Sequence, residues 1–110
     1  MTVGEIAKNL PFSKVSLLDA DRTVEGVYIG DLLSWVMGRA KSGNIWITIM
    51  SNINVIAVAT LADVSCVILA EGVQLDSDIL AAAKAKGVNI LFTDLTSYEI
   101  AAKIAKYLPV

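Results

Sequence analysis

The sequence predicts an α/β fold, in the form of a compact layered domain with a mostly parallel sheet flanked by helices. Short apolar runs alternate with segments that carry helix-start and helix-stop signals, as in a parallel sheet with crossover helices. Residues 64–69 and 88–92 are almost continuously apolar, as parallel strands covered on both faces are. A length of 110 residues without repeats or linkers predicts that residues 1–110 form a single domain.

The strands are predicted from short runs rich in β-branched residues and bounded by turn residues. Glycine, asparagine and aspartate lie between most of these runs, where the chain has to turn. The predicted strands are residues 15–18, 26–29, 45–50, 64–69 and 88–92.

The helices are predicted from their capping residues. A Thr followed three residues later by Glu can form a capping box, in which each side chain bonds the backbone N–H of the other residue. This spacing occurs at Thr2 and Glu5, and it occurs again at Thr96 and Glu99. The other N-cap candidates are Asp31, Asn52 and Asp76 or Ser77, and the expected helix ends are Pro11, Gly38 or Gly43, Gly87 and Pro109.

Composition limits what the domain can bind. A net charge of −2 and an isoelectric point near 4.9 give no basic surface for nucleic acid. Hydrophobic residues make up 55% of the chain, and this surplus can be absorbed by a sheet covered on both faces or by an oligomer interface. We expect a homodimer, the commonest closed assembly, with Trp35, Val36, Val55 and Val58 as candidate contacts.

Residues 42–62 contain no charge and approach the length of a membrane span, about 20 residues. Ser51, Asn52 and Asn54 lie in the middle of this segment, where unpaired polar groups are costly in hydrocarbon. A strand, a turn and a helix explain the segment better than a membrane helix does.

The expected location is the cytoplasm. The single Cys66 cannot form an internal disulfide, which fits a reducing compartment, and its apolar surroundings predict a buried small side chain rather than a reactive thiol. Glu5 and Lys8 stand where a secretory signal would be apolar, so no such signal is expected.

The segment from Asp21 to Trp35 reads DRTVEGVYIGDLLSW and resembles the segment that names the DRTGG domain family. Val24 and Glu25 stand where the family name has two glycines, and Gly26 follows them. Residues 64–72 and 85–93 resemble the non-catalytic N-terminal domain of HPr kinase/phosphorylase. The two resemblances cover about residues 15–108 and imply an accessory module that accompanies catalytic or regulatory domains.

The residue types present argue against catalysis. Histidine is absent, which excludes Ser-His-Asp and Cys-His mechanisms and the commonest zinc ligand. One cysteine is too few for a structural zinc site, and no G-x-x-x-x-G-K-S/T phosphate loop occurs. Asp19, Asp21 and Asp31 have carboxylates, but turn and cap positions explain all three. We therefore expect no enzymatic activity, no metal and no cofactor.

Strand ends offer the best geometry for a ligand. Ligands of open α/β sheets bind beyond the carboxyl ends of the strands, where helix N-termini present free N–H groups to anions. The alternative is that the polar residues there only cap helices, and that Arg22 makes a local ion pair instead of binding a phosphate. The predicted ligand site comprises Arg22, Gly30, Asp31, Ser51, Asn52, Thr93 and Asp94.

Two functions from different classes follow from these features. The first is a non-enzymatic regulatory or protein-interaction module that self-associates and binds a protein partner. The alternative is a small-molecule sensor that binds an anion, either a nucleotide or another phosphorylated metabolite. A small enzyme built on Asp and Arg residues is a third hypothesis.

Overall fold

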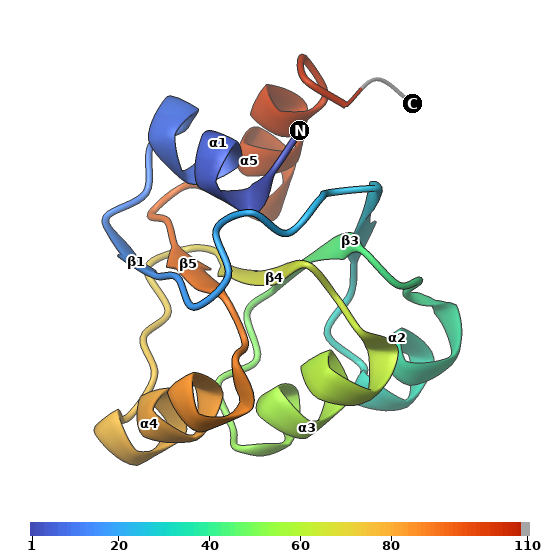
Figure 1. Ribbon diagram of the computed structural model, residues 1–110, viewed down its shortest axis with the longest axis vertical. Coiled ribbons are helices and arrows are strands. Elements are labelled where there is room, and N and C mark those ends of the chain that lie inside the picture. Colours follow the sequence, from blue (N-terminus) through green and yellow to red (C-terminus); the bar gives the residue numbers. More distant parts are fainter. Residues whose placement is uncertain (109–110) are drawn as a thin grey trace.

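The computed structural model describes residues 1–108 and has a five-stranded sheet with helices on both faces (Figure 1). The strand order is β1-β5-β4-β3-β2. Strands β2 to β5 are parallel to one another, and only β1 runs antiparallel, beside β5. The predicted α/β class with a mostly parallel sheet is therefore confirmed. The strands are β1 (Lys14–Ser16), β2 (Gly26–Ile29), β3 (Asn44–Thr48), β4 (Cys66–Leu69) and β5 (Ile90–Phe92).

The helices are placed so that each covers one face of the sheet. Helices α2, α3 and α4 cover one face, and α1 and α5 cover the other (Figure 1). None of the helices in residues 1–108 is long and apolar enough to cross a membrane. Their bounds are α1 (Val3–Asn9), α2 (Leu33–Arg39), α3 (Asn54–Ala62), α4 (Ser77–Lys86) and α5 (Ser97–Ile104).

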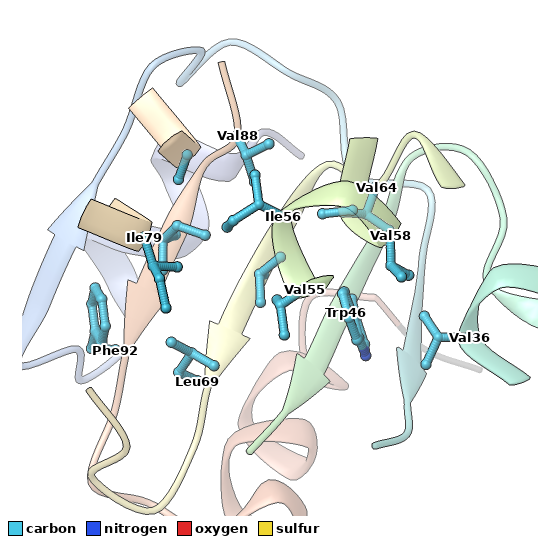
Figure 2. Packing of buried hydrophobic residues seen from close by; sticks show 14 residues of the cluster. Val36, Trp46, Val55, Ile56, Val58, Val64, Leu69, Ile79, Val88 and Phe92 are labelled. Atoms are coloured by element: carbon cyan, nitrogen blue, oxygen red, sulfur yellow. The ribbon is translucent and has the colours of Figure 1, made fainter. Parts of the chain in front are cut away.

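Two hydrophobic cores result, one on each face, because successive side chains of a strand point to opposite sides. Strand β3 is buried along its whole length and contributes to both. Trp46 packs on the side of α2, α3 and α4 together with Val36, Val55 and Phe92 (Figure 2). Ile45 and Ile47 pack on the other side with residues of α1 and α5.

The two capping boxes are confirmed. Thr2 and Glu5 exchange side-chain and backbone hydrogen bonds at the start of α1, and Thr96 and Glu99 do so at the start of α5. Gly87 closes α4 in the left-handed region at φ 72°, as expected of a helix-ending glycine. The expected helix end at Pro109 lies outside the described residues.

Several sequence-based boundaries are wrong. β1 and β3 each begin one residue earlier and end two residues earlier than predicted. Three further boundaries are wrong for local reasons. Helix α2 continues through Gly38 to Arg39. Strands β4 and β5 begin two residues later than predicted, because the N–H groups of Val64 and Val88 bond Ala59 and Ala83 and so close the preceding helices. Those N–H groups are therefore not available to a neighbouring strand.

Candidate functional site

The carboxyl ends of β2 to β5 meet at one edge of the sheet, as the parallel register requires. Gly30 and Asp31 follow β2, while Thr93 and Asp94 follow β5. Ser51 and Asn52 lie between β3 and α3, at the same edge. The structure thus brings six of the seven predicted ligand residues to one edge.

Asp31 has a different role from the predicted helix cap. Its carboxylate accepts hydrogen bonds from Thr48 Oγ1 at 2.8 Å and from the Ile49 backbone N–H at 3.0 Å. Helix α2 instead begins after Leu32, without a side-chain cap. Asp31 therefore ties the loop after β2 to the end of β3, and the Trp46 indole N–H strengthens this tie by donating to the Gly30 carbonyl at 2.8 Å.

Asn52 lies one residue before the N-cap of α3, although the sequence predicted it to be the N-cap itself. Its side-chain oxygen accepts a hydrogen bond from the Asn54 backbone N–H at 2.9 Å, which makes a local turn before α3. The N-cap residue itself is Ile53, so the predicted cap at Asn52 is wrong by one position. Ser51 and Asn52 are both exposed at this turn.

Thr93 is buried, and its hydroxyl is used inside the domain. The hydroxyl donates to the Pro11 carbonyl at 3.1 Å and accepts from the Leu95 N–H at 3.2 Å. Asp94 is exposed beside it and borders a depression of about 340 Å³. The depression is lined by Pro11, Phe12, Ser13, Thr93, Asp94 and Leu95.

The carboxyl edge of the sheet is acidic. Asp78 and Glu99 lie in the first turns of α4 and α5, where carboxylates complement the positive end of the helix dipole. The basic residues of these helices, among them Lys86 and Lys103, lie in the last turns at the opposite edge. An anionic ligand at the carboxyl edge would meet these carboxylates together with those of Asp31, Glu71, Asp76 and Asp94. Lys14, opposite Phe92 at the end of β5, adds a positive charge at this edge, but the carboxylates outnumber it.

Arg22 does not join this group. It lies at the opposite edge, where its guanidinium bonds the carboxylate of Asp63 at 3.0 Å and the carbonyl of the same residue at 2.9 Å. Asp63 ends α3 in the left-handed region at φ 56°. A hydrogen bond from Ser42, followed by the bond and charge of Arg22, lowers the pKa of Asp63. Arg22 is thus a structural clamp between the segment before β2 and the end of α3.

Three of the four predicted dimer contacts lie inside the domain. Val36, Val55 and Val58 belong to the core beneath α2 and α3 (Figure 2), so they cannot reach a second copy. Trp35 is exposed, and the guanidinium of Arg39 lies over its ring, with Cζ 4.1 Å from the ring centre. The prediction therefore needs correction to a different set of apolar residues.

Four of the exposed large apolar residues lie on β2 and around the start of α2. Their exposed fractions range from 37% for Val27 to 61% for Leu32. β2 is an edge strand, so its side chains have a neighbouring strand on one side only. We call this set the β2–α2 apolar surface; it consists of Val27, Ile29, Leu32 and Trp35.

A shallow depression of about 210 Å³ adjoins the β2 part of this surface. Val27 and Ile29 form its wall on the sheet, and Ala101, Ala105 and Leu108 form its wall on and beyond α5. Sequence reasoning missed Val27 and Ile29 because both looked like ordinary strand residues. The strand order that exposes them is not encoded in any local pattern.

Comparison with known proteins adds two matches. The family model of the DRTGG domain matches residues 13–107. Among solved structures, the chain is similar to the CBS and DRTGG domains of the regulatory region of Clostridium perfringens pyrophosphatase, complexed with its activator diadenosine tetraphosphate. The TM-score is 0.59 and the identity 18%, over 69% of this chain and 33% of that chain. This chain thus corresponds to about a third of that structure, and the likeness concerns the fold. No curated protein sequence matches.

Proposed function

This chain belongs to the DRTGG domain family, and from that premise we propose that it is a non-enzymatic regulatory module of the cytoplasm that self-associates through the β2–α2 apolar surface. The observation that carries the proposal is the exposure of large apolar side chains on an edge strand and the helix that follows it. Removing such area from water stabilises an assembly by about 25 cal/mol per Å² before the costs of association.

The chemistry of the chain supports a role without catalysis. It has no histidine, and burial raises the pKa of its only thiol, Cys66, to about 12, so that this thiol is no nucleophile at neutral pH. The resemblance of residues 64–72 and 85–93 to the N-terminal domain of HPr kinase/phosphorylase remains a sequence-based prediction, and it fits the same accessory role.

Light scattering tests the self-association. The expected mass at micromolar concentration is twice the 11.7 kDa of one chain. Ile29→Lys should return the mass to that of one chain, because a charge would replace an exposed apolar side chain in the contact. Leu61→Lys is the matched control, since Leu61 is a 71% exposed apolar residue on α3, outside the β2–α2 apolar surface, and the dimer should persist. A wild-type mass of one chain at all these concentrations would refute self-association.

A nucleotide sensor is the second candidate, favoured by the activator bound in the pyrophosphatase regulatory region. The acidic carboxyl edge opposes an anion there, and we expect diadenosine tetraphosphate and ATP to leave the melting temperature unchanged. A saturable rise would contradict this and favour the sensor, because a ligand at 100 times its Kd stabilises the folded state by about 2.7 kcal/mol.

A further inference from the structure

We propose that two copies of the chain join through the outward backbone groups of Val27 and Ile29, in an antiparallel pairing of the two β2 strands around a two-fold axis at Tyr28. The proposal rests on the self-association proposed above and specifies the contact that produces it. Val27 of each copy would lie opposite Ile29 of the other, and the two sheets would form one continuous sheet.

The hydrogen bonds of the sheet establish which way each backbone group points. The Ala70 N–H bonds the Thr48 carbonyl at 3.1 Å, so Thr48 faces β4 and the preceding residue, Ile47, faces β2. The Ile47 carbonyl accepts from the Gly30 N–H at 3.2 Å, which means that Gly30 faces β3.

The outer edge of β2 therefore presents backbone groups of two residues. Successive residues of a strand direct their peptide groups to opposite sides, so Gly26 and Tyr28 face β3 as Gly30 does. Val27 and Ile29 face outward, each with one N–H donor and one carbonyl acceptor. Within residues 1–108 no strand pairs with this edge. Four backbone groups of each copy are thus available to a second strand.

β2 has no lysine, proline or bulge, the features that commonly protect an edge strand from pairing. The residues Gly26–Ile29 include neither a charge nor a proline, and their register with β3 is continuous. The opposite edge of the sheet differs, because β1 carries Lys14. Since β2 has only four residues, the contact depends on the hydrogen bonds of Val27 and Ile29 and on the side chains around them.

Hydrogen bonding selects the register centred on Tyr28. Val27 then lies opposite the partner's Ile29, and each of the two such pairs exchanges both backbone hydrogen bonds. An axis at Val27 would set Ile29 against the partner's Glu25, whose N–H is already bonded within its own domain. An axis at Ile29 would set Val27 against the partner's Asp31, which lies beyond the end of β2. The axis at Tyr28 alone uses all four outward groups of each copy.

The side chains on both faces of the sheet fit this register. On the α5 face, Val27 and Ile29 of the two copies would form one apolar row beside the depressions at α5. On the α2 face, the Tyr28 ring leans along its own strand, with Cε2 2.8 Å from the position that a Cβ would take on Gly30. The two rings lean in opposite directions, away from the axis, because the strands are antiparallel. Each ring approaches the partner's Gly26, which has no side chain to obstruct it.

Disulfide crosslinking tests the register. In a non-hydrogen-bonded antiparallel pair the Cα atoms lie about 4.5 Å apart, within the range of about 4.4–6.8 Å that a disulfide spans. Tyr28→Cys should therefore give a covalent dimer on mild oxidation, seen on a non-reducing gel. Val27→Cys and Ile29→Cys are the controls, because the two copies of either cysteine would lie about 8 Å apart, two residues along the strand and one strand spacing across. Cys66 is buried and does not compete.

A mixture of the two control variants gives a second test that leaves the Tyr28 ring in place. After the variants are unfolded in urea and refolded together, the cysteine at position 27 of one chain would lie opposite the cysteine at position 29 of the other. Their Cα atoms would be about 5.5 Å apart, as in a hydrogen-bonded pair. The mixture should crosslink several times more than either variant alone. This comparison decides the register if Tyr28→Cys fails to fold, as judged by circular dichroism.

The outcomes separate this contact from self-association in general. A wild-type mass of one chain refutes both. A wild-type dimer in which neither Tyr28→Cys nor the mixture crosslinks more than the single control variants refutes the β2 contact and leaves self-association standing. Stronger crosslinking of Val27→Cys alone or of Ile29→Cys alone would move the axis to that residue and refute the register around Tyr28.

Discussion

Trp46→Ala is expected to lower the free energy of unfolding by about 3–5 kcal/mol, the range for truncating a buried aromatic side chain. Trp46 is 0% exposed and lies at the centre of β3, packed between the sheet and helices α2 and α3 (Figure 2). The substitution leaves a cavity in this core. It also removes the donor to the Gly30 carbonyl, and so loosens the loop between β2 and α2.

Urea unfolding followed by circular dichroism at a fixed protein concentration measures this loss. Tyr98→Ala is the control, since Tyr98 is an aromatic residue that is 80% exposed and lies outside the β2–α2 apolar surface. Its loss should be about 0.5 kcal/mol or less, as for other surface substitutions. Equal losses for the two aromatic residues would mean that the core is not organised around Trp46.

Asn89→Ala is expected to lower the free energy of unfolding by about 2–3 kcal/mol, because it leaves partly buried backbone groups without partners. The Asn89 side-chain oxygen accepts from the N–H groups of Leu18 and Asp19 at 2.8 and 2.9 Å. Its side-chain NH₂ donates to the carbonyls of Asp19 and Ser65 at 2.8 and 3.0 Å. One buried amide thus holds the loop after β1 against the start of β4.

The same unfolding measurement distinguishes this amide from an ordinary surface asparagine. Asn9→Ala removes an exposed side chain that bonds only the Glu5 carbonyl within its own helix, and should change the stability by about 0.5 kcal/mol or less. An Asn89→Ala variant as stable as Asn9→Ala would show that water replaces the lost hydrogen bonds.

The parts of the fold that sequence predicted well depend on neighbours in the chain. Both capping boxes form between residues three apart, and Gly87 ends α4 because of its own backbone conformation. The strand starts were missed because Val64 and Val88 give their N–H groups to the preceding helices, although each looks like the first residue of an apolar run. A hydrophobic pattern does not reveal whether a backbone N–H bonds the preceding helix or a neighbouring strand.

The site residues were predicted less well, because their partners lie far away in sequence. Asp31 bonds Thr48 across the sheet, and Arg22 bonds Asp63 after a separation of 41 residues. The valines show the same limit, since Val27 and Val55 are chemically identical and only the strand order exposes the first. The sequence predicted the edge of the sheet at which the carboxyl ends of the strands meet. The strand order, which the sequence did not predict, determines which side chains are exposed.

The place of β1 has a consequence for how the chain reaches its native state. β1 comes early in synthesis, yet its partner β5 comes near the end, with Lys14 opposite Phe92. Contacts between such distant residues form slowly, because a long loop has to close first. Until then the backbone edge of Ile90–Phe92 is open, in a segment that is wholly apolar. β1 therefore cannot pair until β5 has been synthesised. Its pairing then covers the open edge of β5 and protects the newly made domain from aggregation.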